Sequence, residues 1–376
     1  MHFAWRQAME SINLNVRFVF LSISLIVCLN SNSYANEVFS SQSLSPETKT
    51  STYSLPALNA ISNATSISGI SSGAFMASQF HVAYSNDLVG VGIVAGGPWN
   101  CAASNPLFPA IVNATTTCMN PCKAGICGPF PDSKFLSAIA EMDAKKGNID
   151  PIDNLKDDNV YIFSGSQDKT VITKVVDTTF DFYKKLKVKN IEYMNNLDAG
   201  HAFITNNPED AECNKTADPY INYCNMSQAR DILKHIYKGL KSPAIKISGE
   251  LIKFNQHEFL TKDQINRSSM DDNAFVYIPK SCTTNQCRVH VALHGCAQGV
   301  SVIGTEFITD TGYLETADTN KIIVLFPQVK SSNLNPMNPN GCWDFWGYST
   351  YNLSIYHKKS APQMEAIKKM IDRLIS

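Results

Sequence analysis

Short apolar runs alternate with stretches of helical periodicity along most of this chain. Runs with the length of buried strands occupy residues 64–68, 88–95, 159–163, 190–194, 289–293 and 322–326. Helical spacing of apolar positions is found over residues 74–85, 133–146, 171–186, 227–240, 305–317 and 362–375. Residues 246–279 resemble two further strands. This alternation predicts an α/β fold with a mostly parallel sheet and helices on both faces.

The first 61 residues do not follow this pattern. Arg6 and Arg17 precede an apolar run from Phe18 to Cys28, and small residues end at Ala35, so residues 1–35 have the character of a signal peptide. The apolar run is too short for a membrane span, and we expect no stable membrane insertion. Residues 36–61 are rich in Ser, Thr and Asn and predict an irregular lead-in. We expect residues 62–376 to form one catalytic domain, exported to the periplasm or the medium.

Charge excludes several classes of partner. Of 376 residues, 32 are Lys or Arg and 33 are Asp or Glu, and no basic stripe points to nucleic acid. No nucleotide loop or paired metal-ligand motif is present, so we expect neither a cofactor nor a metal. A neutral or weakly charged substrate fits this composition, while the oligomeric state stays open.

Ten cysteines remain if the signal peptide is removed, and an even number in an exported chain predicts disulfides. Cys213 with Cys224 and Cys282 with Cys287 are the simplest local pairs. Zinc is the alternative for the closely spaced Cys118, Cys122 and Cys127. The cysteine- and proline-rich segment 97–132 is expected to be a long loop that forms a rim or lid.

Candidate chemistry begins at Gly69-Ile70-Ser71-Ser72-Gly73, which matches the G-x-S-x-G pattern of a nucleophilic serine. Its position between a strand and a helix strengthens the assignment, because this turn lifts the central hydroxyl out of the sheet. We therefore expect Ser71 to be the nucleophile and the Ser72 amide to be one oxyanion donor. A simple Ser/Gly turn is the alternative.

A base and an orienting acid follow in the order expected for this chemistry. Asp168 comes directly after an apolar strand, and its alternative role is to cap the next helix. His201 lies in a loop beside Gly200 and is the best base; Asp198, three residues away, is the rival acid but is better suited to shaping the turn. Of the other histidines, His257 and His357 are expected at the surface.

His294 ends a buried strand in the sequence Leu293-His294-Gly295-Cys296-Ala297-Gln298, which has the character of an oxyanion loop. Its expected role is to brace this loop or contact substrate, and the Cys296 amide would be the second oxyanion donor. In ordinary α/β-hydrolases this loop precedes the nucleophile, whereas here it follows His201. Circular permutation is the simplest explanation, and it is tolerated where the original termini lie close together.

Six ordered blocks carry a resemblance to the poly(3-hydroxybutyrate) depolymerases whose lipase box lies near the N-terminus. The blocks are GISSGAFMASQFHVAYS, GGPWNCA, GSQDKTV, DAGHAF, LHGCAQ and GCWDFWGY. The resemblance implies a circularly permuted α/β-hydrolase, a Ser71–Asp168–His201 triad, oxyanion donors at Ser72 and Cys296, and a Cys296–Cys342 bridge.

The same resemblance implies hydrolysis of a short-chain polyester or oligoester of 3-hydroxybutyrate through an acyl-enzyme. Many secreted members carry a separate polymer-binding domain, but this chain ends with a helix after the catalytic region. The aromatic residues Trp343, Phe345 and Trp346 are therefore candidates for holding substrate, with core packing as the alternative. A feruloyl or acetyl-xylan esterase is the rival function, and an inactive exported binding protein is the rival from another class.

Overall fold

The computed structural model describes residues 53–123, 125–352 and 354–376. The expected signal peptide and residues 36–52 of the lead-in lie outside the described residues. An eight-stranded sheet forms the centre, with strand order β10-β11-β13-β12-β1-β2-β5-β6. Its strands, in chain order, are β1 (Thr65–Ile70), β2 (Leu88–Val94), β5 (Asn159–Phe163), β6 (Asn190–Met194), β10 (Glu250–Asn255), β11 (Asn273–Ile278), β12 (Arg288–Leu293) and β13 (Ile322–Phe326).

Most neighbouring strands are parallel, which confirms the predicted α/β fold. Only β11 runs against its neighbours, pairing antiparallel with both β10 and β13. Three of the parallel strands, β2, β5 and β13, are mostly apolar runs with nearly all residues buried, as a sheet covered by helices requires.

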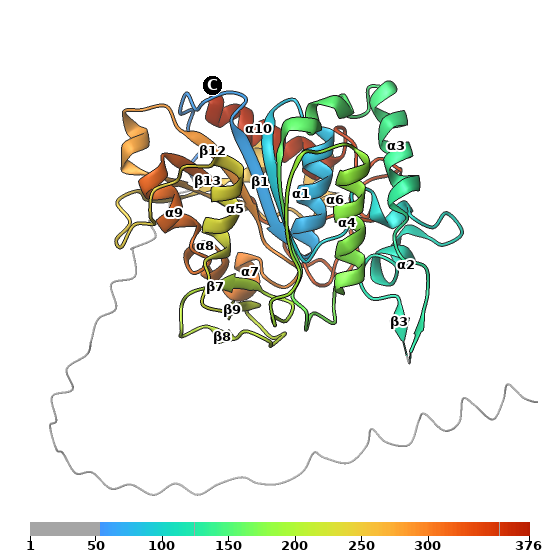
Figure 1. Cartoon of the computed structure of the whole chain (residues 1–376). Helices are drawn as coiled ribbons and strands as arrows, with labels where there is room; N and C mark the ends of the chain where they lie inside the picture. The colour runs from blue at the N-terminus through green and yellow to red at the C-terminus, as the bar shows by residue number, and fades with distance from the viewer. Residues whose placement is uncertain (1–52, 124, 353) are drawn as a thin grey trace, which may run out of the picture. The chain divides into compact units, whose positions relative to one another are not determined.

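Helices cover both faces of the sheet (Figure 1). One apolar cluster packs the sheet against α1 (Ser72–Ala83), α3 (Ser133–Lys145), α4 (Thr173–Lys185) and α10 (Pro362–Ile375). The other packs it against α5 (Gln228–Tyr237), α8 (Glu306–Thr309) and α9 (Tyr313–Asn320). Alternate residues of β13 belong to different clusters: Ile323 and Leu325 face the first, and Val324 and Phe326 face the second. Within the described residues, no helix combines the length and apolar character that crossing a membrane requires.

The two ends of the described chain meet beside the sheet. Ala60 donates its amide to Leu374 O at 3.0 Å, and Leu58 donates to the same carbonyl at 3.2 Å. The early strand β1 pairs in parallel with the late strand β12, from Ser66–His290 to Gly69–Leu293. The short segment 238–249 joins α5 to β10. This is the arrangement expected if an α/β-hydrolase chain is joined at its original ends and opened before β1.

Polar side chains tie β1 to β12 on the face covered by α5 and α9. His290 contacts Ser66 Oγ through Nδ1 at 2.6 Å and Ser68 Oγ through Nε2 at 2.7 Å. Ser68 also bonds the Tyr313 hydroxyl at 2.5 Å, and Ser66 donates to the Tyr237 hydroxyl at 2.7 Å. These hydroxyls satisfy one another inside the core, which explains how serines occupy the central strand.

Three local predictions differ from the structure. The helix expected over residues 305–317 is divided into α8 and α9, because Gly312 between them has a positive φ of 82°. A small sheet of β7 (Phe203–Thr205), β8 (Ala211–Glu212) and β9 (Ile221–Tyr223) was not predicted, since its strands are too short to show a period. The expected loop 97–132 contains α2 (Ala110–Thr115) and a hairpin of β3 (Cys122–Lys123) and β4 (Ile126–Cys127).

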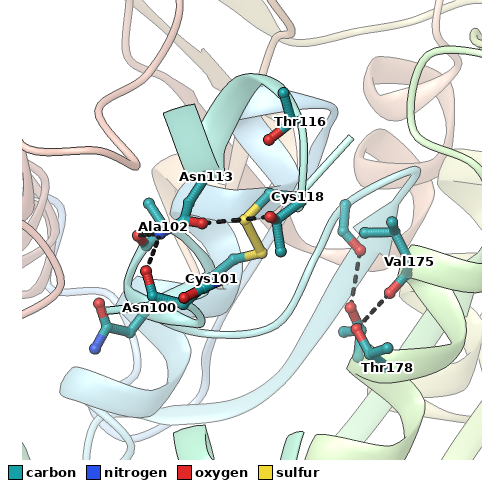
Figure 2. Close-up of a disulfide and its surroundings, with 12 residues drawn as sticks. Asn100, Cys101, Ala102, Asn113, Thr116, Cys118, Val175 and Thr178 are labelled. Atoms are coloured by element: carbon teal, nitrogen blue, oxygen red, sulfur yellow. Dashed lines mark hydrogen bonds between the residues drawn. A yellow bond between two sulfur atoms is a disulfide. The ribbon is translucent and has the colours of Figure 1, made fainter. Parts of the chain in front are cut away.

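Five disulfides use all ten cysteines of the described part. They join Cys101–Cys118, Cys122–Cys127, Cys213–Cys224, Cys282–Cys287 and Cys296–Cys342. The two local pairs and the Cys296–Cys342 pair agree with expectation, and the zinc alternative is wrong because its three cysteines are bridged. Figure 2 shows the Cys101–Cys118 bridge beside Asn113, which lies in α2. Asn113 is buried and donates its amide group to Ala102 O and Asn105 O, so α2 is held by both a bridge and hydrogen bonds.

Candidate active site

Ser71 lies in a strained turn between β1 and α1. Its φ of 55° and ψ of −123° are unfavourable for a residue with a side chain, and strain of this kind costs about 1–3 kcal/mol and clusters at active sites. Its amide donates to Val94 O at 2.9 Å, and its carbonyl accepts from the Ala74 and Phe75 amides. The sharp turn exposes the hydroxyl at the carboxyl end of β1, as expected for a nucleophile.

The two glycines of the motif allow the turn to form. A Cβ on Gly73 would lie 2.4 Å from His294 O, and a Cβ on Gly69 would lie 2.4 Å from the Gly73 carbonyl. Both distances are far below van der Waals contact, so no larger residue fits. The glycines therefore bring Ser71 against the end of β12, where the expected oxyanion loop begins.

Asp168 and His201 form a buried pair after β5 and β6. His201 Nδ1 lies 2.7 Å from Asp168 Oδ2, and the other carboxylate oxygen accepts from the Thr170 and Val171 amides at 2.8 and 2.9 Å. Because Nδ1 is used by Asp168, Nε2 is the nitrogen left for a proton from Ser71. The His201 amide donates to Thr216 Oγ1 at 2.9 Å, which fixes the loop.

The contacts of Asp168 and Asp198 differ. Helix α4 starts at Thr173, and Ile172 is its N-cap, so Asp168 orders the turn before the helix instead of capping it. Asp198 is exposed, and its carboxylate accepts from Gln167 Nε2 at 2.7 Å and Ser166 Oγ at 3.3 Å. These contacts give Asp198 the turn-shaping role that the sequence indicated.

His294 braces the loop after β12. Its Nδ1 donates to Gly295 O at 2.7 Å, and its Nε2 accepts from the Val329 amide at 3.2 Å. The imidazole is fully buried, and burial lowers its pKa to about 4, so it stays neutral with both nitrogens engaged by backbone. The contact with substrate expected as one role of His294 is excluded by this burial, while the bracing role fits.

The amides of Ser72 and Cys296 are the expected oxyanion donors. Ser72 is the first residue of α1, where an amide has no partner within the helix. In the part of the chain that the structure describes, neither amide donates to another residue. Cys296 is held in place through its disulfide with Cys342.

A cavity of about 690 Å³ opens beside the Ser71 turn and the loop after β12. Ser71, His201, Gly295 and Cys296 line it, and mostly apolar side chains supply the remaining walls. Among the walls are residues of and after α2, the loop 337–340 and the aromatic pair 345–346: Ile111, Ala114, Thr115, Met119, Met337, Asn338, Pro339, Asn340, Phe345 and Trp346. Figure 1 shows α2 and the β7–β9 sheet at the end of the molecule toward which β1 points.

Two of the three aromatic residues expected to hold substrate line this cavity. Trp346 and Phe345 line it, and Phe345 stacks on Phe75 with a centroid distance of 4.3 Å. Trp343 is fully buried, does not line the cavity, and packs on His294 at 5.6 Å between ring centroids. The expectation that Trp343 binds substrate is therefore wrong, because its ring fills the core beneath the oxyanion loop.

One further histidine differs from expectation, and several wall residues were missed. His357 is buried and not at the surface: its Nε2 bonds Asp143 Oδ2 at 3.2 Å, and its ring meets Trp99 edge-on.

Thr216, Tyr220 and Gln298 line the cavity, although no role was predicted for their side chains from the sequence. The i, i+3, i+4 spacing of Ile111, Ala114 and Thr115 after Pro109 is a helical signal that could have revealed α2. No group of three or more His, Cys, Asp or Glu residues within the described ranges is arranged to hold a metal ion.

Comparison with known proteins gives consistent relatives. The chain is 40% identical over 329 residues to a poly(3-hydroxybutyrate) depolymerase of Delftia acidovorans, covering 86% of this chain but only 62% of that protein. It is 34% identical over 343 residues to a polyhydroxybutyrate depolymerase of Talaromyces funiculosus, covering 86% of this chain and 92% of the relative. No protein-family model matches the sequence.

Two solved structures share the fold. A PHB depolymerase from Penicillium funiculosum matches with a TM-score of 0.74, and a serine-to-alanine PHB depolymerase variant complexed with an R3HB trimer matches with 0.76. Both are 32% identical to this chain, and each match covers 86% of this chain and 99% of the other.

Proposed function

This chain belongs to the poly(3-hydroxybutyrate) depolymerase family, and on that premise we propose that it is an exported serine esterase that cleaves ester bonds of poly- or oligo(3-hydroxybutyrate). The observation that carries the proposal is that the strained Ser71, His201 and Cys296 line one cavity, while Asp168 bonds His201. The amides of Ser72 and Cys296 have no hydrogen-bond acceptor among the described residues.

The reaction follows from the roles these groups can take. His201 Nε2 takes the proton of Ser71 as its oxygen attacks the ester carbonyl, and Asp168 holds the imidazole in the required tautomer. The amides of Ser72 and Cys296 stabilise the negative charge on the carbonyl oxygen. His201 then protonates the leaving alcohol. In the second half of the reaction His201 takes a proton from water as the water attacks the acyl-enzyme, and then returns a proton to the Ser71 oxygen as the acid product leaves.

The character of the cavity supports a neutral aliphatic substrate. Its walls carry Ile111, Ala114, Met119, Met337 and Trp346, with no Lys, Arg, Asp or Glu among the lining residues. An uncharged chain of esters with methyl branches can bury its apolar surface against such walls. Exposed apolar side chains are also found in the segment before and within α2, including Leu107 and Phe108.

Product analysis tests the proposed substrate. The mature protein would be incubated with amorphous poly(3-hydroxybutyrate) and, separately, with feruloylated and acetylated xylan, and the soluble products identified by mass spectrometry. We expect 3-hydroxybutyrate monomer or short oligomers from the polyester and no release from xylan. Release of ferulate or acetate alone would move the assignment to a carbohydrate esterase.

Labelling separates an enzyme from an inactive binding protein. A fluorophosphonate probe should label the wild-type protein and fail to label Ser71→Ala, which should also lose turnover while remaining folded. A wild-type protein that takes no label and hydrolyses no ester would refute the enzyme assignment. The five disulfides support export, because such bridges persist in oxidising compartments.

A further inference from the structure

Gln298 makes three hydrogen bonds to backbone beside the proposed active site. Its Oε1 accepts from the Gly295 amide at 2.8 Å, and its Nε2 donates to Pro219 O at 2.9 Å and Tyr220 O at 3.2 Å. The residue is 2% exposed and neutral; its bond to Gly295 is buried, and its bonds to Pro219 and Tyr220 are partly buried. One side chain therefore joins the loop after β12 to the segment before β9.

The first of these bonds acts on the proposed oxyanion donor. Cys296 follows Gly295 directly, so the orientation of its amide depends on how residues 295–298 are held. On the other side of Cys296, Ala297 donates to Asn340 O at 2.8 Å. Gln298 fixes the side next to Gly295, which leaves the Cys296 amide clamped between two anchored residues.

The other two bonds act on the segment that holds the base. Within this segment, Thr216 Oγ1 accepts from the His201 amide at 2.9 Å. Tyr220 O accepts from the Phe203 amide at 2.8 Å, two residues after His201. The carbonyl of Tyr220 thus bonds both Gln298 and the backbone that carries the base.

We propose that Gln298 is a positioning residue that sets the oxyanion donor at Cys296 and the base at His201 in fixed relation to each other. Strands β1, β2 and β5 separate β12 from β6 in the sheet, so the two loops have no common strand to hold them in register. Small displacements of reacting groups reduce rates strongly, and an amide donor acts only when it is aligned with the developing oxyanion. This inference rests on the proposed esterase function.

The test compares two near-isosteric substitutions, Gln298→Met and Gln256→Met. Gln256 is a matched control: it is fully buried, its Nε2 donates to Asp271 O and Gln328 O, and its Oε1 accepts from the Gln328 amide. It does not line the cavity. Both variants lose one accepted and two donated hydrogen bonds, so a purely structural effect should be similar in the two.

Three readouts distinguish positioning from stability: kcat and KM for p-nitrophenyl butyrate, the inhibition constant of a short-chain trifluoromethyl ketone, and the unfolding midpoint. For Gln298→Met we expect kcat to fall roughly 10- to 100-fold with KM nearly unchanged. Affinity for the ketone, whose adduct with Ser71 carries an oxyanion, should fall by a similar factor. Gln256→Met should lower the unfolding midpoint but keep kcat within about twofold of wild type.

Several results would overturn the inference. Wild-type kcat in folded Gln298→Met, or equal losses of kcat in both variants, would show that Gln298 has no positioning role. If Gln298→Met does not fold, Gln298→Asn takes its place, because its shorter side chain cannot span both loops; wild-type kcat there would also refute the proposal. Absence of ester hydrolysis by the wild-type protein would instead refute the proposed function, and the inference with it.

Discussion

Asparagine in place of Asp168 would reverse the polarity of the hydrogen bond to His201. The amides of Thr170 and Val171 both need an acceptor at Oδ1, at 2.8 and 2.9 Å, so the asparagine oxygen should take that position. Its NH2 group would then face His201 Nδ1, which lies 2.7 Å from the present Oδ2. The imidazole would have to carry its proton on Nε2, the nitrogen that accepts the proton of Ser71 in the proposed mechanism.

The wrong tautomer costs a Ser–His–Asp triad about 10⁴-fold in kcat, equivalent to about 5 kcal/mol of transition-state stabilisation. We expect a loss of this size for Asp168→Asn with p-nitrophenyl butyrate, and an unfolding midpoint close to wild type because both amides keep their acceptor. Asp198→Asn is the control, since this exposed carboxylate accepts hydrogen bonds from Ser166 and Gln167 in the turn; the activity of this variant should stay within about twofold of wild type. A larger loss from Asp198→Asn than from Asp168→Asn would refute the assignment of the acid.

Three further predictions concern pH, the wall of the cavity and the polymer surface. Burial lowers the pKa of His290 to about 3 and that of His294 to about 4. In the unfolded chain these histidines titrate near pH 6.5, so the unfolded state takes up protons below that pH and the folded state does not. The unfolding free energy should therefore fall, down to about pH 4, by about 1.4 kcal/mol for each histidine and each pH unit; equal stability to urea at pH 7 and pH 5 would contradict this. Replacing Cys101 and Cys118, 17 residues apart, by alanine should lower the unfolding free energy by about 3 kcal/mol and slow hydrolysis of 3-hydroxybutyrate oligomers more than that of p-nitrophenyl butyrate. An unchanged ratio of the two hydrolysis rates would show that α2 does not contribute to substrate binding. Leu107→Ser, at a position 88% exposed, should weaken adsorption to a polyester film without changing soluble-ester activity, and wild-type adsorption would exclude this side chain from the contact.

The features that were predictable from sequence are local ones. Strand β5 has the bounds expected from the sequence, because four consecutive buried apolar residues after Asn159, followed by Ser-Gly, leave little alternative. The turn at Ser71 is likewise encoded within five residues, since Gly69 is needed to close the turn against Gly73, and Gly73 for the close approach to the end of β12. Asp168 and His201 followed from their places after strands, because the carboxyl ends of parallel strands meet at one edge of a sheet.

The features that were missed depend on contacts between distant parts of the chain. Trp343 was expected at the cavity, but its ring is buried in the core. Its backbone amide donates to Ser72 Oγ, and the next residue, Asp344, holds the surrounding segment in place. The buried Asp344 carboxylate accepts from four backbone amides and the Ser349 hydroxyl, which turns residues 341–349 inward. His357 was assigned to the surface from its polar neighbours, yet its partner Asp143 lies in α3. Neighbours in sequence give no information on such partners.

Circular permutation can leave this site intact because the site and the chain ends lie at opposite ends of β1. The described chain enters β1 from the segment where Ala60 bonds Leu374 O, and Ser71 follows the other end of the strand. Six residues of strand span about 20 Å, so opening the chain there does not disturb the nucleophile. Figure 1 shows the C-terminus at the end from which β1 starts. The loops of Asp168, His201 and Cys296 each remain attached to their own strand, and the order of strands in the sheet, not their order in the chain, brings them together.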